Sequence, residues 1–502
     1  MTDLLSKDEY LSFARGLDLP REAFIDGGFR PAISGRTFAT SNPATGETLS
    51  DVAACDADDV DLAVAAARTA FEDGRWSGQA PAARKGVLLR LCALMREHAR
   101  ELAVMEALDS GKTIFDCETV DIPEAINCIE WHAEATDKIY DQVAPASAEH
   151  IALVVREAIG VVGLVLPWNF PLLMMAWKIG PALAAGNSVV LKPAAETTLT
   201  ALRVAELAVE AGLPAGILNV VPGSGREVGE PLGRHGDVDL ISFTGSTETG
   251  KRFLSYAAES NAKEVVLEMG GKNPCIVMDD ATSLDTVAEH VVQGAYWNMG
   301  ENCSAISRLI VHSAVKEELL ERIEAHAREW PMGDPLDPSV RVGALVSKAH
   351  FDKVTSYLDK IGDGRLRMGG AARDGIYVEP TIVDLPGNDH PLARDEIFGP
   401  VLAVITVDGF DEAIRIANDT PYGLCASLFT GNAKRAIRGA RALRAGTVTV
   451  NSFGEGDSTT PFGGYKQSGF GGRDNGVHAH DQYTQLKTIW LDLADESDGD
   501  GA

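Results

Sequence analysis

Four short apolar stretches decide the fold of the middle of the chain: GVVGLVLPW (160–168), NSVVLKP (187–193), GILNVVPG (216–223) and LISFTGS (240–246). Each is rich in β-branched residues and bounded by glycine or proline, as buried strands are. Helical sequence such as TALRVAELAVEAG (200–212) lies between them. This alternation predicts an α/β protein with a parallel, doubly wound, Rossmann-like sheet, which binds ligands at the carboxyl ends of its strands.

The rest of the chain extends this pattern in both directions. Residues 60–145 have apolar residues at helical spacing. A second α/β region begins near EVVLEMGGKNPCIVMDD (264–280) and continues past residue 450. A last strand-like stretch, YTQLKTIWLDL (483–493), follows the glycine-rich segment 462–476. A strand detached in this way is expected to pair with another element or another subunit.

Composition excludes several classes of protein. The formal net charge of −28 argues against nucleic acid or an anionic membrane as a partner. The 7 cysteines are scattered, which argues against a disulfide scaffold or a zinc cluster, so no metal is expected and a reducing cytoplasm fits. No signal peptide is visible, and the longest apolar run, 159–166, is too short to span a bilayer.

Cys303 is the first candidate for chemistry. It follows the small turn Gly300-Glu301-Asn302 rather than lying inside an apolar run. Most free cysteines are buried and inert. A nucleophilic cysteine needs a thiolate, a group that holds the oxyanion and a route for product release.

Two further residues could supply those needs. Glu268 ends a strand-like run before Gly270 and could serve as a general base; a surface or capping glutamate is the simpler reading. Asn169 lies between two prolines in PWNFP, where a rigid amide could donate to an oxyanion; a packed turn residue is the alternative.

Glycine-rich turns raise the question of a cofactor. GSGREVG (223–229) and GSTETG (245–250) both follow strands and enter helices, although neither is G-x-G-x-x-G. Glycine after a strand is usually only a turn. The helix that begins after Gly245 could still face a pyrophosphate.

Together, PWNFP, FTGSTETG, LEMGGK, GENC, EIFGP and PFGGYKQSG resemble the aldehyde dehydrogenase superfamily in order and spacing, from FIDGGF to LKTIW. Within it the chain is most similar to the gamma-glutamyl-gamma-aminobutyraldehyde dehydrogenases, through WHAEATDKIYDQVA, GDSTTPFGGYKQSG and HAHDQYTQLKTIW.

The resemblance implies roles for the matching residues. Cys303 would be the nucleophile, Glu268 the general base and Asn169 the oxyanion donor, with Lys178 near the active site. The thiohemiacetal formed on Cys303 would give up a hydride, and Glu268 would activate the water that hydrolyses the thioester. The implied cofactor-binding residues are Trp168, Lys192, Ala195, Gly225, Gly229, Phe243, Gly245, Ser246, Glu396 and Phe398.

The resemblance also implies three parts. These are an NAD(P)-binding domain (1–133 and 152–267), an α/β catalytic domain (268–470) and a small β oligomerisation arm (134–151 and 471–495). The acidic tail, 496–502, is expected to be disordered. A homo-oligomer, dimer or tetramer, is expected.

The chain departs from the family pattern at a few positions. Glu301 replaces the usual glutamine and could raise the pKa of the nearby thiol if it points inward, although it is expected to point away. Ala195 stands where a glutamate usually accepts the adenosine ribose hydroxyls and repels a 2′-phosphate. NAD is the expected cofactor, and NADP is possible because Ala195 replaces that glutamate. In the family an acidic residue follows the S-G-x-G-R motif. Asp474 would take that place, but this chain has one more glycine, so the sequence does not fix where Asp474 lies.

The expected substrate is an amino-aldehyde such as gamma-glutamyl-gamma-aminobutyraldehyde. Four carboxylates are placed by the resemblance at the mouth of the substrate tunnel, where they would attract an amino group; in so acidic a chain they could equally reflect general composition. Asp121 and Glu124 would share a helical face there. The tunnel wall would be aromatic. The full set is Asp121, Glu124, Glu455 and Asp457 at the mouth, with Phe170, Trp177, Trp297 and Phe462 on the wall.

Other functions stay open at this stage. One is a broad aliphatic or hydroxy-aldehyde dehydrogenase, and another is a non-catalytic scaffold of the same fold. A CoA-acylating relative is disfavoured because such enzymes generally lack a glutamate at the position of Glu268. Succinic semialdehyde is disfavoured because the mouth segments contain no arginine.

Overall fold

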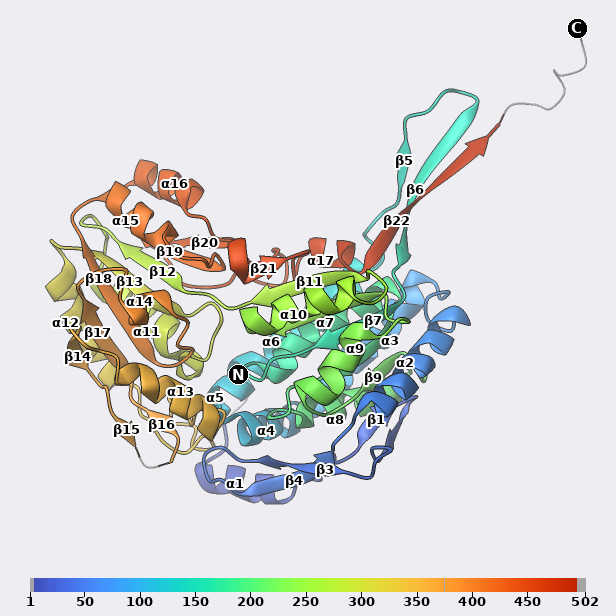
Figure 1. Cartoon of the computed structure of the whole chain (residues 1–502), viewed down its shortest axis with the longest axis horizontal. Helices are drawn as coiled ribbons and strands as arrows, with labels where there is room; N and C mark the ends of the chain where they lie inside the picture. The colour runs from blue at the N-terminus through green and yellow to red at the C-terminus, as the bar shows by residue number, and fades with distance from the viewer. Residues whose placement is uncertain (1–3, 374, 494–502) are drawn as a thin grey trace, which may run out of the picture.

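The computed structural model describes residues 4–373 and 375–493. The tail predicted to be disordered, 496–502, lies outside the described residues. Two large sheets, each covered by helices, make up most of the molecule, and a three-stranded arm projects from one end (Figure 1). The α/β fold class predicted from the sequence is confirmed.

The first sheet has a parallel centre in the order β9-β8-β7-β10-β11. The chain winds outward from β7 to β8 and β9, then crosses back to β10 and β11. The direction therefore switches between β7 and β10, where a doubly wound sheet opens its ligand crevice. Across the sheet the strands are β2 (Gly28–Arg30), β1 (Ala23–Ile25), β9 (Leu218–Val220), β8 (Ser188–Lys192), β7 (Val161–Val165), β10 (Leu240–Gly245), β11 (Glu264–Met269) and β21 (Gly469–Phe470).

Helices cover both faces of this sheet, which explains why its strands are apolar throughout. Val162 and Leu164 of β7 face one cluster of helices, whereas Val161 and Val165 face the other, because side chains alternate along a strand. The first cluster takes in α3 (Pro81–Glu97), α4 (Ala99–Ser110), α6 (Ile122–Ala135), α7 (Pro171–Ala185) and α8 (Leu199–Glu210); the second takes in α2 (Ala57–Glu72), η2 (Gly225–Gly229), α9 (Glu230–Arg234) and α10 (Thr247–Ala258).

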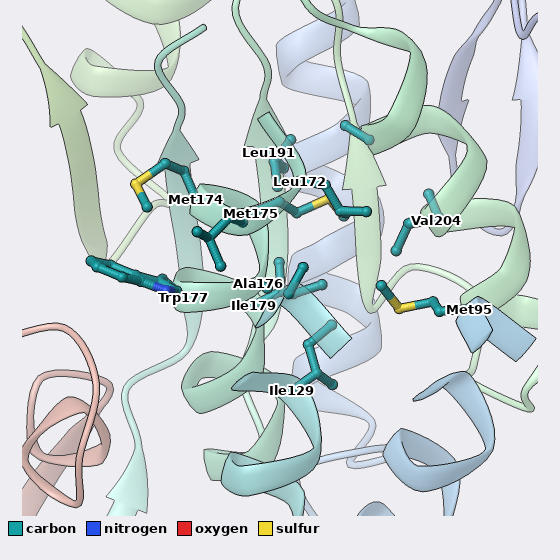
Figure 2. Packing of buried hydrophobic residues seen from close by; sticks show 14 of the residues in the cluster. Met95, Ile129, Leu172, Met174, Met175, Ala176, Trp177, Ile179, Leu191 and Val204 are labelled. Carbon is teal, nitrogen blue, oxygen red and sulfur yellow. The ribbon is translucent and has the colours of Figure 1, made fainter. Parts of the chain in front are cut away.

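Helix α7 is buried along nearly its whole length. Its apolar side chains meet Leu191 of β8, Val204 of α8 and Met95 of α3 on one side, while Trp177 points to the opposite side (Figure 2). Pro171 begins the helix, where a missing N–H costs nothing, and Gly186 ends it with a φ of 101°. The helix therefore provides a rigid support for Asn169, just before its start, and for Trp177, near its middle.

The second sheet is parallel except at one edge and is also covered on both faces. Its strands, in order, are β14 (Arg365–Met368), β17 (Thr381–Leu385), β18 (Val401–Val407), β13 (Ile306–His312), β12 (Asn273–Val277), β19 (Cys425–Phe429) and β20 (Thr447–Val450). Its helices are α11 (Leu284–Tyr296), α12 (Lys316–Arg328), α13 (Lys348–Leu358), α14 (Pro391–Arg394), α15 (Phe410–Asn418) and α16 (Ala433–Ala442).

The two sheets join end to end. Strand β11 of the first sheet leads through 270–272 directly into β12 of the second. The carboxyl ends of one sheet therefore face the amino ends of the other. The remaining short elements are α1 (Lys7–Arg15), β3 (Thr37–Ser41), β4 (Thr48–Ala53), α5 (Ile114–Asp116), the π-helix η1 (Cys117–Asp121), η3 (Trp297–Gly300), β15 (Ala372–Arg373), β16 (Tyr377–Val378), η4 (Lys466–Ser468) and α17 (His478–Asp481).

The arm is an antiparallel sheet of β5 (Gln142–Ala144), β6 (His150–Ala158) and β22 (Thr484–Asp492). Its boundaries differ from those expected. It takes in β6 as far as Ala158, and it excludes 471–483, which pack against the body of the protein because Asp474 and Tyr483 are buried. The assignment of one sheet to cofactor binding and the other to catalysis stays a prediction. Among the described residues, none of the helices is long and apolar enough to cross a bilayer.

Candidate active site

A cavity lies where the two sheets meet, and it brings together many of the residues predicted from the sequence. Trp168 and Asn169 follow β7, Gly245 ends β10 and Ser246 follows it, so the cavity opens at the switch point of the first sheet. The predicted residues on its wall are Trp168, Asn169, Trp177, Gly245, Ser246, Glu268, Cys303, Glu396, Phe398 and Phe462.

Cys303 is the one half-buried cysteine; the other six are buried. It ends an irregular loop in which Asn298 and Met299 have φ values of 52° and 55°, a conformation that side chains rarely adopt. Asn273 holds the loop by donating to the Cys303 carbonyl at 2.8 Å. Burial, followed by the charge of Glu455, raises the pKa of the thiol well above its ordinary value, so a proton must leave before the sulfur becomes a strong nucleophile.

Asn169 is held from three sides. Its side-chain amide donates to the Glu301 carbonyl at 2.9 Å. Its backbone carbonyl oxygen accepts hydrogen bonds from Asn298 Nδ2 at 2.9 Å and from Lys112 Nζ at 3.2 Å. An amide has two N–H donors, so one fixes the orientation and the second remains for an oxygen in the cavity.

Glu268 reaches the cavity from the carboxyl end of β11 and is only 4% exposed. Neither of its carboxylate oxygens makes a well-formed hydrogen bond to a residue that the structure describes. Burial raises its pKa well above the ordinary value, and Asp474 raises it further, whereas Lys178 opposes the shift. Burial beside Asp474 thus favours the protonated form of Glu268, and shifts of this kind are typical of carboxyl groups that transfer protons in active sites.

Lys178 lies behind this wall rather than on it. The fully buried ammonium donates to Ser242 Oγ at 2.9 Å and lies 3.4 Å from Asp474 Oδ2. Asp474 lies on the cavity wall and accepts from Gln482 Nε2 at 3.0 Å. The placement of Asp474, left open by the sequence, is therefore beside Lys178 and close enough to Glu268 to influence its charge.

The cofactor candidates fall into two groups. Ser246 caps helix α10, its Oγ accepting from Thr249 N, so the positive end of that helix faces the cavity. Across the cavity, Glu396 accepts from Gly271 N at 2.8 Å. The Phe243 ring lies off the cavity wall, in the core beneath Gly245 and 5.0 Å from the ring of Phe253, so its role at the cofactor stays a prediction.

The remaining cofactor candidates lie away from the cavity wall. Lys192 ends β8 and is buried, which lowers its pKa to about 8. Ala195 is half-buried and Glu196 is exposed. Gly225 and Gly229 of η2 have open space where a side chain would begin, so this turn leaves room for a ligand.

The aromatic candidates form two pairs. Trp177 and Phe462 line the cavity with ring centroids 5.0 Å apart. Phe170 and Trp297 form a second pair at 5.1 Å, away from the cavity wall. Lys112 Nζ lies 3.7 Å from the centre of the Phe170 ring.

The sequence predicted that four carboxylates form an acidic mouth of the substrate tunnel. The prediction that all four are free is wrong. Asp121 is buried in an ion pair with Lys112, whereas Glu124 is exposed. The two do not share a face because the helix changes from π to α between them. Glu455 is half-buried and accepts from Ser304 Oγ, and Asp457 is exposed and accepts from Thr459.

Sequence reasoning missed several residues at the site. Lys112 follows a helix-ending glycine, a position with no signal for burial. His350 and Lys353 of α13 line the cavity, as do Met174 and Leu424, and nothing in their local sequence marks them. Glu301 points away from the thiol, as expected, with its side chain accepting from Val346 N at 3.1 Å. Within the described ranges, no group of three or more metal-binding side chains is assembled.

Comparison with known proteins identifies this arrangement. The model of the aldehyde dehydrogenase family matches residues 29–489. A Pseudomonas aeruginosa aminoacetaldehyde dehydrogenase is 67% identical over 98% of this chain and 100% of its own length. A solved gamma-glutamyl-gamma-aminobutyraldehyde dehydrogenase from Burkholderia cenocepacia is 52% identical, with a TM-score of 0.96 over 98% of this chain and 100% of that one.

A solved indole-3-acetaldehyde dehydrogenase, complexed with NAD+, is 48% identical, with a TM-score of 0.96 over 97% of this chain and 100% of that one. These matches cover both sheets and the cavity between them. The chain therefore belongs to the aldehyde dehydrogenase family and is an enzyme that oxidises an aldehyde to a carboxylic acid with NAD(P).

Proposed function

We propose that the preferred substrates are amino-aldehydes, which the enzyme converts to amino acids with NAD as the favoured cofactor. The observation that carries this proposal is the 67% identity, over nearly the whole chain, to an aminoacetaldehyde dehydrogenase. The 52% identity to a gamma-glutamyl-gamma-aminobutyraldehyde dehydrogenase supports the same class. The high negative charge of the chain favours the approach of a cationic substrate.

In this proposal Cys303 is the nucleophile. Its sulfur attacks the aldehyde carbon, and the second N–H of Asn169 stabilises the resulting oxyanion, together with the backbone N–H of Cys303. The carbon then loses a hydride, which the nicotinamide accepts when bound, and Cys303 is left as a thioester. The half-buried position of Cys303 on the cavity wall supports this role.

Glu268 then acts as the general base for hydrolysis. Water loses a proton to the Glu268 carboxylate and attacks the thioester carbon, and the Cys303 sulfur leaves as the acid forms. The absence of well-formed hydrogen bonds to Glu268 in the described part of the chain supports this role, because its oxygens are not committed to structural partners. Lys178 and Asp474 modulate the charge of Glu268 from one side.

The residues of the first sheet fit a dinucleotide. The capped start of α10 and the open glycine turn of η2 provide N–H donors and space for a pyrophosphate. Lys192 lies at the carboxyl end of β8, in position for the adenosine ribose. Ala195 itself supplies no carboxylate to exclude a 2′-phosphate, and the carboxylate whose charge acts on Lys192 is that of Glu196, one residue further on, so we expect NAD to be preferred while NADP is still accepted.

The arm supports a homo-oligomer. Leu486 and Trp490 of β22 are 67% and 59% exposed in the single chain. Exposed apolar side chains along a projecting strand are typical of subunit interfaces. Sedimentation velocity with Trp490→Asp tests this; a variant that sediments like the wild type would contradict it.

A second candidate is an enzyme for apolar or aromatic aldehydes. Met174, Trp177, Leu424 and Phe462 make much of the cavity wall apolar, and an indole-3-acetaldehyde dehydrogenase is 48% identical. The predicted acidic mouth cannot argue against this candidate, because Asp121 is already paired.

The test compares kcat/KM for matched pairs of aldehydes. Aminoacetaldehyde and 4-aminobutanal are set against propanal and pentanal, with indole-3-acetaldehyde as the aromatic probe, each with NAD and with NADP. An advantage of at least about tenfold for the amino-aldehydes supports the proposal, since that ratio corresponds to one discriminating contact of about 1.4 kcal/mol. Equal rates, or a lead for the aromatic aldehyde, contradict it in favour of the second candidate. Cys303→Ala must lose turnover with every substrate.

A further inference from the structure

The loop that carries Cys303 is fixed through its neighbour Glu301. The Glu301 backbone carbonyl accepts from Asn169 Nδ2 at 2.9 Å and from Asn298 Nδ2 at 3.0 Å. Its side chain accepts from the Val346 N–H at 3.1 Å and is only 1% exposed. One residue therefore links the nucleophile loop both to Asn169 and to the segment that enters helix α13.

His350, in the first turn of α13, continues this link to the opposite wall of the cavity. Its Nε2 lies 2.6 Å from the Phe398 carbonyl oxygen and 3.4 Å from Glu301 Oε1. A carbonyl oxygen only accepts, so Nε2 carries the hydrogen. The imidazole ring also packs against Trp168, with ring centroids 4.9 Å apart.

The contact between Glu301 and His350 is not an ion pair at neutral pH. Burial raises the pKa of Glu301 well above its ordinary value and lowers the pKa of His350 to about 4. His350 is therefore neutral, and burial favours the neutral form of Glu301. A neutral carboxyl group has nearly the shape and the acceptor oxygen of an amide, which accounts for glutamate at a position where the family pattern has glutamine.

The loop that carries Cys303 and the loop that carries Phe398 are in close backbone contact. Gly300 has a φ of 70°, and a side chain there would begin 2.4 Å from the Gly399 carbonyl oxygen. Gly300 precedes Glu301, and Gly399 follows Phe398. The nucleophile loop and the loop that bears Phe398 therefore touch backbone to backbone, beside the bridge from Glu301 to His350.

We propose that Glu301 and His350 are positioning residues that hold Cys303 and Asn169 at a fixed distance from Phe398 on the opposite wall. This inference rests on the proposed function, in which the sulfur and the nicotinamide meet between these walls. Reaction rates depend steeply on such distances, and a displacement of about 1 Å can cost about 100-fold in rate. The bridge spans the gap because Glu301 lies on the loop before β13 and His350 lies in the first turn of helix α13.

Two pairs of variants test the proposal. Glu301→Gln keeps an oxygen acceptor for the Val346 N–H and should retain kcat within about threefold, whereas Glu301→Ala should lower kcat by about 10- to 100-fold with little change in the aldehyde KM. His350→Gln keeps an N–H donor for the Phe398 carbonyl and should retain both kcat and the cofactor KM. His350→Ala should lower kcat and raise the cofactor KM. Glu329→Ala, at an exposed position, is the control.

A purely structural role predicts a different pattern. It would lower the unfolding midpoint of each alanine variant and leave the kcat of the folded fraction unchanged, which contradicts the proposal. Loss of kcat in Glu301→Gln equal to that in Glu301→Ala also contradicts it, because it would mean that the charge matters. If Glu301→Ala does not fold, His350→Ala decides alone: wild-type kcat and cofactor KM in that variant overturn the proposal.

The double variant Glu301→Ala/His350→Ala tests whether the two residues act as one bridge. Its loss of kcat should be smaller than the product of the two single losses, because the second change removes a link already broken. A simple product overturns the bridge. Failure of the proposed function can be told apart from failure of the bridge. It would appear as normal turnover by Cys303→Ala, whatever the variants of Glu301 and His350 do.

Discussion

The ammonium of Lys112 lies 2.7 Å from the carboxylate of Asp121, and neither side chain is more than 1% exposed. Asp121 is thus committed to a buried partner, although its sequence position suggested a free charge at the substrate entrance. Lys112 also donates to the Asn169 carbonyl, so the pair supports the loop that holds the proposed oxyanion donor.

Removing the charge of Asp121 should therefore destabilise the protein. Asp121→Asn leaves the buried Lys112 ammonium without its counter-charge, which costs about 3–5 kcal/mol in the free energy of unfolding. Urea unfolding measures this loss. Adding Lys112→Met to Asp121→Asn should recover part of it, because no buried charge remains.

Glu124→Gln is the matched control, since Glu124 is exposed. Its free energy of unfolding should change by no more than about 0.5 kcal/mol. A wild-type unfolding curve for Asp121→Asn would show that Lys112 is neutral or solvated, contrary to the structure.

Cys303 should be the cysteine that reacts first with iodoacetamide. Six of the seven cysteines are buried, so mass spectrometry at limiting reagent should find one label per chain, on Cys303. Burial raises the thiol pKa, so the labelling rate should increase steadily with pH.

Cys303→Ser should remove the label, and Cys425→Ala should leave it in place. A label on any buried cysteine at the same rate would contradict the accessibility described here.

Glu268 should control the acidic side of the pH–rate profile. A general base works only when ionised, and burial together with Asp474 raises the Glu268 pKa. Turnover should therefore rise with pH through that raised pKa. Asp474→Asn removes a negative neighbour, lowers the Glu268 pKa and should shift this limb to lower pH.

Glu268→Gln provides the reference for that experiment. Its kcat should fall by about 10²- to 10⁴-fold, as for loss of a general base, and its remaining rate should lose the acidic limb. If the limb stays in place in both variants, another group titrates.

The cofactor preference should respond to position 195. Ala195→Glu restores a carboxylate near Lys192, which should repel a 2′-phosphate and lower kcat/KM for NADP by at least about tenfold, or 1.4 kcal/mol. The value for NAD should stay the same or improve. Initial rates with both cofactors measure the ratio.

Glu210→Gln is the control, because Glu210 is exposed at the last position of helix α8. An unchanged NADP-to-NAD ratio in Ala195→Glu would mean that this segment does not face the adenosine ribose.

Much of the fold could be read from local sequence. Strands β7, β8 and β10 were predicted from apolar runs such as 161–165, because strands covered on both faces must be apolar throughout. Cys303, Glu268 and Asn169 were chosen for their turns and neighbouring prolines or glycines, and the cavity brings all three together.

The failures share a physical cause. Asp121 and Glu124 were assigned to one face on the assumption of a regular α-helix, but a π-turn ends between them. Glu455 was expected as a free charge at the mouth, whereas it accepts a hydrogen bond from Ser304. Each error came from a backbone detail or a contact of one or two residues that packing decides.

The sequence by itself determined the α/β architecture, because hydrophobic periodicity and turn chemistry are local properties of the chain, and the family motifs in it predicted which residues react. Only the tertiary structure decided which charges are paired and which loops touch. Lys112 meets Asp121, Lys178 meets Asp474, and Glu301 meets His350. Those contacts depend on how the sheets and helices pack, and no local pattern encodes the low-dielectric surroundings that set the pKa values at the site.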